Sequence, residues 1–196
     1  LLTGSRDAVA LDAGVSYVGA AEYDMDFTVA GESISSGLPE SPFLNYRAAF
    51  RVEVADGSEV LATVREPYFS RTYGSYCGHL NTPYKLENAH HPAVVKRGKV
   101  IVCAHALDRI YYDLGAKAHR DLFTNLIKLL HTQPMVEAGL PSAGRVSLLH
   151  FPEQRRYVLH LLYAAPLQRG RCLIIEDMPV LREVPVRLRL PEAARE

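Results

Sequence analysis

The sequence predicts an α/β domain over residues 1–133, followed by a small antiparallel β domain over residues 134–196. Val100–Ala104 is a continuous apolar run, which is typical of a strand buried on both faces of a parallel sheet. Residues 114–131 repeat leucine at helical spacing and predict a helix that packs on this sheet. Beyond residue 134, short apolar segments alternate with turns, a pattern that favours antiparallel strands.

Composition and charge narrow the class of protein. The chain has 196 residues, 48% hydrophobic and 22% charged, which is the globular norm. Lys plus Arg and Asp plus Glu both total 22, and this balance gives no support to nucleic acid or acidic lipid as a partner, because such partners need a positive field. No apolar run of membrane-spanning length occurs. The three cysteines are too few for a disulfide framework, so a reducing, cytoplasmic location is expected.

The N-terminal half contains several short expected elements. Leu1–Gly4 resembles the end of a buried strand entering a turn, and the chain is therefore expected to be the C-terminal piece of a longer protein. Residues 5–16 suggest a loop or short helix, and residues 17–21 a weak strand. Residues 31–46 are rich in Gly and Pro and favour irregular structure.

Two segments around Asp56-Gly57 predict a β-hairpin. Residues 48–54 alternate polar and apolar side chains, and residues 59–64 form a second strand-like run. Residues 65–98 show no sustained period, and such a long loop is usually functional or packed at an interface. In the helix at 115–131, the leucines are expected to face the sheet.

The C-terminal segment predicts four strands. They are expected at residues 146–149, 157–163, 173–175 and 184–190, with a polar turn at 153–156 between the first two. The boundary between the two domains is expected near residues 133–139, where the helical leucine pattern gives way to short apolar segments.

The aromatic loop at residues 66–84 is the first candidate site. Its aromatic side chains suit three roles: an oligomer contact, a sugar-stacking platform, or a cover for the sheet. Arg71 lies among them and can donate a forked pair of hydrogen bonds to a carboxylate. The candidate binding or interface residues are Tyr68, Phe69, Arg71, Tyr73, Tyr76 and His79.

Zinc-type donors also occur in this region. Cys77 and His79, together with His90 and His91, have suitable side chains, but only one tightly spaced pair is present. Hydrogen-bonded loop histidines are the preferred interpretation, so no metal and no other cofactor is predicted.

Three further groups of residues have side chains suited to catalysis. Cys103 and His105 follow the apolar strand, but Val102 and Ala104 flank the cysteine where a nucleophile elbow requires glycines, so a core cysteine is preferred. His150 and Glu153 lie in an expected hairpin, where a Pro-Glu turn is unremarkable, so no catalytic role is assigned to them. The carboxylates considered as a glycosidase pair, which default to surface charge, are Glu66, Asp108, Asp113, Glu176 and Asp177. No catalytic residue is predicted in this chain.

Several segments in order resemble a known family. They are Gly14–Gly19, Glu66–Tyr73, Cys77-Gly-His79 with Thr82-Pro83, Gly98–Val102, Arg120–Ile127, Leu140–Ser142 and His160–Tyr163. This set resembles the C-terminal part of bacterial glycoside hydrolases of the β-galactosidase type, the family forty-two enzymes and their relatives. The resemblance covers nearly the whole chain and rests on order and spacing.

The resemblance implies a specific architecture. In such enzymes a (β/α)₈ barrel with two catalytic glutamates comes first. A three-layer α/β domain with a glutamine-amidotransferase-like (flavodoxin-like) fold follows and makes trimer contacts, and a small antiparallel β domain ends the chain. This sequence would begin late in the α/β trimerisation-type domain, so no catalytic glutamate falls within it.

The function implied is non-catalytic assembly and support within a carbohydrate-active hydrolase. The expected partners are the parent's own barrel and further copies in a homo-oligomer, a trimer, and the parent's substrate is a carbohydrate. A stand-alone carbohydrate- or protein-binding module that uses the 66–84 loop is the main alternative. An amidotransferase-like enzyme that uses Cys103 is a weaker one.

Overall fold

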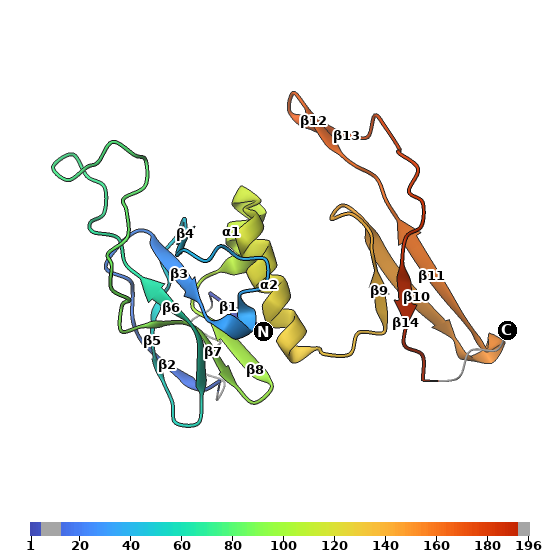
Figure 1. Ribbon diagram of the computed structural model, residues 1–196, viewed down its shortest axis with the longest axis horizontal. Helices are drawn as coiled ribbons and strands as arrows, with labels where there is room; N and C mark the ends of the chain where they lie inside the picture. The colour runs from blue at the N-terminus through green and yellow to red at the C-terminus, as the bar shows by residue number, and fades with distance from the viewer. Residues whose placement is uncertain (5–12, 192–196) are drawn as a thin grey trace. The chain divides into compact units, whose positions relative to one another are not determined.

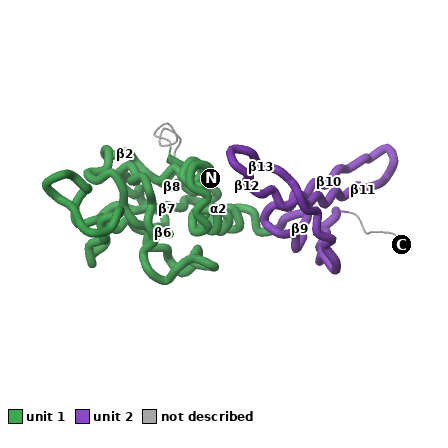
Figure 2. The backbone as a smooth tube through the Cα atoms, turned by 90° about the horizontal axis from the view of Figure 1, so that it is seen from above, with its two compact units in different colours: residues 1–132 green, residues 133–196 purple. Residues whose placement is uncertain are grey.

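The computed structural model describes residues 1–4 and 13–191 (Figure 1). The segment 5–12, expected to be a loop or short helix together with residues 13–16, lies outside the described residues. The chain forms two compact units, residues 1–132 and 133–196 (Figure 2). Strands account for 35% of the structure and helices for 15%.

The predicted three-layer α/β fold of the flavodoxin-like, glutamine-amidotransferase-like type is wrong. Unit 1 contains a curled, mixed and largely antiparallel sheet instead. In this six-stranded sheet only the β1–β8 pair is parallel, with Leu2 opposite Val102. The strands, in spatial order, are β1 (Leu2–Thr3), β8 (Val100–Cys103), β7 (Pro92–Arg97), β6 (Glu59–Arg65), β3 (Asp26–Ala30) and β4 (Phe43–Asn45).

The central strands are buried on both faces. In β7, Val94 packs into the core beneath the helices, and Val95 packs into a second core on the opposite face. Ile101 and Val102 of β8 divide in the same way. The continuous apolar run therefore reports burial on both faces, as expected, but its neighbour β7 runs antiparallel.

A two-stranded ribbon covers the second face. It consists of β2 (Val15–Gly19) and β5 (Arg51–Val54), which pair antiparallel with an irregularity between Tyr17 and Gly19. Val15 and Val52 fill the core between this ribbon and the sheet.

The hairpin predicted around Asp56-Gly57 is wrong. The turn is present, with Gly57 at a φ of 78°, but the strands on its two sides join different sheets. β5 pairs with β2, whereas β6 pairs with β3 and β7. The turn residues Asp56 and Gly57 specify a reversal of the chain, but they do not determine which strands β5 and β6 pair with.

Two helices cover the first face of the sheet. α1 (Leu107–Leu114) and α2 (Lys117–Leu130) are separated by Gly115, whose φ of 64° closes the end of α1. Leu122 and Leu126 of α2 are fully buried, as their spacing predicts. A short 3-10 turn, η2 (Glu32–Ile34), interrupts the irregular segment that follows β3.

The described residues of unit 2 form three two-stranded antiparallel ribbons. The antiparallel pairing expected for this part of the chain is present, but none of its described residues is buried. The pairs are β10 (Arg145–Phe151) with β11 (Arg156–Leu162), β12 (Leu167–Arg169) with β13 (Cys172–Ile174), and β9 (Val136–Ala138) with β14 (Val186–Leu188). The short turn η3 (Pro152–Gln154) joins β10 to β11.

Candidate functional site

The 66–84 loop leaves the sheet between β6 and β7 and projects from unit 1 (Figure 1). Its two ends are joined by a β-bridge between Pro67 and Tyr84. The Tyr68 amide donates to the Pro83 carbonyl at 3.1 Å, and the Lys85 amide donates to the Glu66 carbonyl at 2.8 Å. The base of the loop is therefore held like the start of a hairpin.

Ionic contacts reinforce this base. Glu66 accepts a hydrogen bond from Arg51 Nη2 at 2.7 Å and from Lys85 Nζ at 3.2 Å. Lys85 also donates to the Tyr23 hydroxyl at 2.9 Å, and this hydrogen bond raises the pKa of Lys85. Glu66 is thus bound by two cations, which hold together strand β5 and the two ends of the loop.

The tip of the loop exposes its aromatic side chains. Tyr73 is fully exposed and Tyr76 is 72% exposed, whereas Phe69 is half-buried. Arg71 Nη1 donates to the carbonyl of His79 across the loop at 2.9 Å. A hollow of about 800 Å³ lies among Arg71, Thr72, Tyr73 and Tyr76. Three predicted residues thus come together, whereas Tyr68 and Phe69 lie outside this hollow.

A buried polar network inside unit 1 connects β3, β4, the segment after β8 and helix α2. Asp26 and His105 side chains are fully buried, and the distance from Asp26 Oδ1 to His105 Nε2 is 2.6 Å. The second Asp26 oxygen accepts the Ala49 N–H at 2.9 Å. Burial opposes charge on both groups, but their attraction and hydrogen bond outweigh it. The pKa of Asp26 is therefore lowered, and the pKa of His105 is raised to about 10.

Asn45 extends the network to helix α2. Its Nδ2 donates to Asp26 Oδ1 at 3.0 Å and to Thr28 Oγ1 at 2.8 Å. Its Oδ1 lies 3.1 Å from His119 Nε2, which must be the donor because an amide oxygen only accepts. Burial and the nearby His105 charge lower the pKa of His119 to about 4, so this histidine is neutral.

Sequence reasoning missed most of this network. It considered His105 only as a partner of Cys103, whereas in the structure His105 interacts with Asp26 as well as with Cys103. A signal for His119 was available, because it lies on the same helical face as Leu122 and Leu126 and is equally buried. A histidine on a buried face needs a hydrogen-bond partner, but the sequence does not reveal which one.

Four of the other candidate residues have structural partners. Asp108 accepts the Thr3 hydroxyl at 2.6 Å, and Asp113 pairs with Arg47 and Arg109. Glu176 pairs with Arg169 at 2.6 Å. In β10, His150 stacks on Tyr157 with ring centroids 4.2 Å apart.

The zinc-type side chains do not converge. The Cys77 thiol lies 3.4 Å from the carbonyl oxygen of His79, within its own loop. Among residues 1–4 and 13–191, no group of three or more His, Cys, Asp or Glu side chains is arranged to hold a metal ion.

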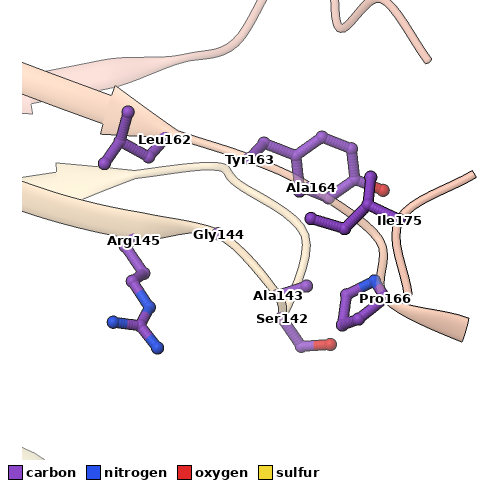
Figure 3. A pocket seen from close by; sticks show the side chains of 9 residues that line it. All are labelled: Ser142, Ala143, Gly144, Arg145, Leu162, Tyr163, Ala164, Pro166 and Ile175. Atoms are coloured by element: carbon purple, nitrogen blue, oxygen red, sulfur yellow. The ribbon is translucent and has the colours of Figure 1, made fainter. Parts of the chain in front are cut away.

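A hollow of about 610 Å³ lies at the open end of the β10–β11 hairpin in unit 2 (Figure 3). Leu162, Tyr163, Pro166 and Ile175 supply much of its lining, and Arg145 is its one charged lining residue. This composition offers no pair of groups for acid–base chemistry.

The burial of the three cysteines predicts an order of chemical reactivity. Cys172 is exposed, Cys77 is half-buried, and Cys103 is fully buried in the core of unit 1. We expect iodoacetamide to label Cys172 and Cys77 in the folded chain, and Cys103 only after unfolding in urea, because a buried thiol is shielded from reagent. Peptide mass mapping of native and unfolded samples measures this, and rapid native labelling of Cys103 would contradict its core placement.

The two histidines of the buried network predict a stability maximum near pH 6.5. His119 has a folded pKa of about 4, below its usual 6.5, so stability falls as the pH drops from 6.5 to 4. His105 has a folded pKa of about 10, so its contribution is lost as the pH rises from 6.5 towards 10. Burial and Arg51 also lower the pKa of His91, which adds to the acid-side loss.

Thermal unfolding measured across this pH range tests the expectation. His119→Gln keeps an N–H donor for Asn45 but removes the titrating group, so its melting temperature should fall less steeply below pH 6.5. An acid-side slope unchanged in His119→Gln would show that other groups cause it.

These observations define a β-rich module in which a buried polar network joins strands to a helix, and which presents an exposed aromatic loop. In the part of the chain that the structure describes, no helix is long and apolar enough to cross a membrane.

Comparison with solved structures finds a similar protein. The chain superposes on α-L-fucosidase isoenzyme 2 from Paenibacillus thiaminolyticus with a TM-score of 0.86 and 30% sequence identity. The match covers 92% of this chain and 27% of the fucosidase, so the chain spans about a quarter of that enzyme. No protein-family model and no curated protein matches. The neighbour is a glycoside hydrolase, but it gives no support to the finer resemblance to family forty-two β-galactosidases.

Proposed function

We propose that this chain is a non-catalytic assembly and support region of a glycoside hydrolase. The similarity to about a quarter of an α-L-fucosidase supports this proposal, because it leaves most of such an enzyme to carry the chemistry. The parent would hydrolyse an O-glycosyl bond with carboxylates outside this chain. The parent's location would be cytoplasmic, which the three free cysteines support.

The 66–84 loop is the observation that carries the assembly role. Ordering a long irregular loop costs about 1–2 kcal/mol of backbone entropy per residue. Contacts at the base offset part of this cost, yet Tyr73 and Tyr76 at the tip remain exposed. Aromatic side chains beside an arginine are typical of the central residues of protein interfaces. We assign this tip to a contact with another copy in a homo-oligomer, in particular a trimer, or with the parent's own barrel.

Unit 2 supports the same role. None of its described residues is buried, and two-stranded ribbons alone are marginally stable in water. Large apolar side chains lie on its surface, which is typical of a face that another part of an assembly covers. Those at least half exposed are Leu162, Leu173, Ile175, Met178 and Val180.

A stand-alone binding module is the second candidate. The hollow among Arg71, Thr72, Tyr73 and Tyr76 favours it, because a cation beside aromatic rings suits a sugar or a protein partner. The two functions differ in a measurable way, since self-assembly raises the particle mass of the purified protein, whereas a binding module keeps its mass until a partner is added.

Tyr73→Ala in the full-length parent tests the assembly role. Removing a central aromatic residue from an interface costs about 2 kcal/mol or more, a roughly 30-fold loss of association. We expect light scattering to show a shift towards smaller particles at micromolar protein concentration, with reduced turnover if the loop borders a neighbour's active site.

Tyr112→Ala is the matched control, because Tyr112 is 83% exposed on α1 and lies outside the loop. A Tyr73→Ala parent that keeps both its particle mass and its turnover would remove the loop from this role. Unchanged mass with weakened glycan binding would favour the binding module.

A further inference from the structure

We propose that the outer edge of strand β11 pairs antiparallel with β11 of a second copy of this chain, with Leu159 opposite Leu159 on a two-fold axis. β10 and β11 form a hairpin that pairs without interruption from Arg145–Leu162 to Phe151–Arg156 (Figure 1). Two such hairpins would then join into one four-stranded sheet. This pairing rests on the assembly role proposed for unit 2 and names its partner there.

The outer edge of β11 is open. Among the described residues, β10 is the one strand that pairs with β11, whereas β10 also contacts β9. Apart from the ladder to β10, the backbone of residues 156–162 makes no hydrogen bond to the described residues. An edge of this kind presents a row of unpaired N–H and C=O groups, which is a template for a further strand.

β11 also lacks the features that keep an edge unpaired. Natural edge strands are short, or carry a lysine, a proline or a bulge that opposes pairing. The edges of the six-stranded sheet in unit 1 follow this rule, because β1 has two residues and β4 has three. β11 has seven residues, contains neither Lys nor Pro, and pairs with β10 without a bulge. Its one Lys, Arg, Asp or Glu residue, Arg156, stands at the first position.

The charge of β11 favours an antiparallel partner of the same sequence. With Leu159 on the axis, Arg156 of one copy lies at the opposite end of the new ladder from Arg156 of the other. The facing pairs are Arg156 with Leu162, Tyr157 with Leu161, and Val158 with His160. Parallel pairing in register would instead set Arg156 directly against Arg156, and like charges in that position are destabilising. A two-fold, self-complementary contact is also the commonest interface between identical chains.

The pairing would extend an apolar face of the hairpin. Residues that lie opposite each other share a face, so Leu148 and Leu159 lie on the same face as Val146 and Leu161. Val146 and Leu161 are exposed. A single two-stranded hairpin is marginally stable in water, whereas three or more strands with a hydrophobic face can be stable. Joining two hairpins meets this condition.

Disulfide cross-linking of the 196-residue chain tests the position of the axis. Leu159→Cys, combined with Cys77→Ser and Cys172→Ser, should give a covalent dimer when copper phenanthroline and oxygen oxidise the two thiols. Facing Cα atoms in an antiparallel pair are about 4.5–5.5 Å apart, which suits a disulfide. Ser147→Cys in the same background is the control, because Ser147 lies on β10. Three strand spacings, roughly 14 Å or more, would separate it from its counterpart, too far for a disulfide.

The expected yield of covalent dimer on a non-reducing gel is at least tenfold higher for Leu159→Cys than for Ser147→Cys. Equal yields at the two positions would overturn the proposal.

A charge exchange at the axis provides a second test. Leu159→Lys and Leu159→Glu each set like charges against each other, so each should weaken dimer formation at least tenfold in sedimentation experiments. An equimolar mixture of the two variants should restore it, because Lys then faces Glu. Mixing cannot rescue a hairpin that has merely unfolded, so a mixture that stays as weak as its components would overturn the pairing.

The charge exchange is made in the Tyr73→Ala background, so that a contact through the tip of the 66–84 loop does not contribute to the measured mass. The β11 pairing and the role of the loop can therefore fail separately. A Tyr73→Ala parent of unchanged mass removes the loop from assembly, whereas the cross-link and the charge exchange report on β11 alone.

Discussion

Asp26→Asn is expected to lower the free energy of unfolding by roughly 3–5 kcal/mol, the usual cost of breaking a buried ion pair by neutralising one partner. Asp26 accepts hydrogen bonds from His105, Asn45 and the Ala49 amide. An asparagine of the same shape replaces one carboxylate oxygen by an N–H group, which must then face one of these donors. If Asn45 turns to avoid the clash, it loses His119. The loss of hydrogen bonds therefore extends from β3 through β4 to helix α2.

Urea unfolding followed by far-ultraviolet circular dichroism measures this effect. Glu59→Gln is the matched control, because it makes the same chemical change on β6 in the same sheet. The Glu59 side chain is 61% exposed, and its oxygen lies 3.8 Å from Lys96. Exposed pairs of this kind contribute about 0–1 kcal/mol. Equal losses in the two variants would show that the Asp26 network adds no special stability.

Leu126→Ala is expected to cost roughly 2–5 kcal/mol, because emptying a core leucine site removes burial and leaves a cavity. Leu126 is fully buried against the sheet and belongs to the core that includes Ile101 and Leu122. The strands beneath Leu126 and the backbone of its own helix α2 limit how far the emptied site can collapse.

Lys128→Ala is the control on the same helix, two residues away. Lys128 is exposed, so its removal should change the free energy of unfolding by less than about 0.5 kcal/mol. The same urea experiment compares both variants. Similar losses at both positions would mean that the buried face of α2 is wrongly assigned.

The helix illustrates what local pattern can predict. Leucines spaced three and four residues apart define a buried stripe whatever lies beneath it, so Leu122 and Leu126 were identified from the sequence. The segment 107–113 was not predicted as helix, because α1 has only eight residues, and just Leu107 and Ile110 in it are buried. Short helices carry too few periodic positions to stand out.

Of the candidate functional residues, some could be predicted from the sequence and others could not. The exposed aromatic loop was identified because crowded tyrosines and prolines are visible in the sequence. The Asp26–His105 pair was not, because its members are separated by 79 positions and meet only when β3 and the end of β8 enter one unit.

By itself, the sequence determined the buried stripe of α2, the two-faced burial of β8 and the antiparallel character of the C-terminal segment, because each follows from the order of apolar residues along the chain. The tertiary structure alone decided which strands pair. It placed β8 antiparallel to β7, sent β5 and β6 to different sheets, and thereby replaced the expected α/β fold with a curled, mostly β one. The physical reason is that every strand offers the same backbone N–H and C=O groups, so the backbone does not select which strand pairs with which. The side-chain pattern determines which faces are buried, whereas pairing depends on contacts between segments that are distant in the sequence.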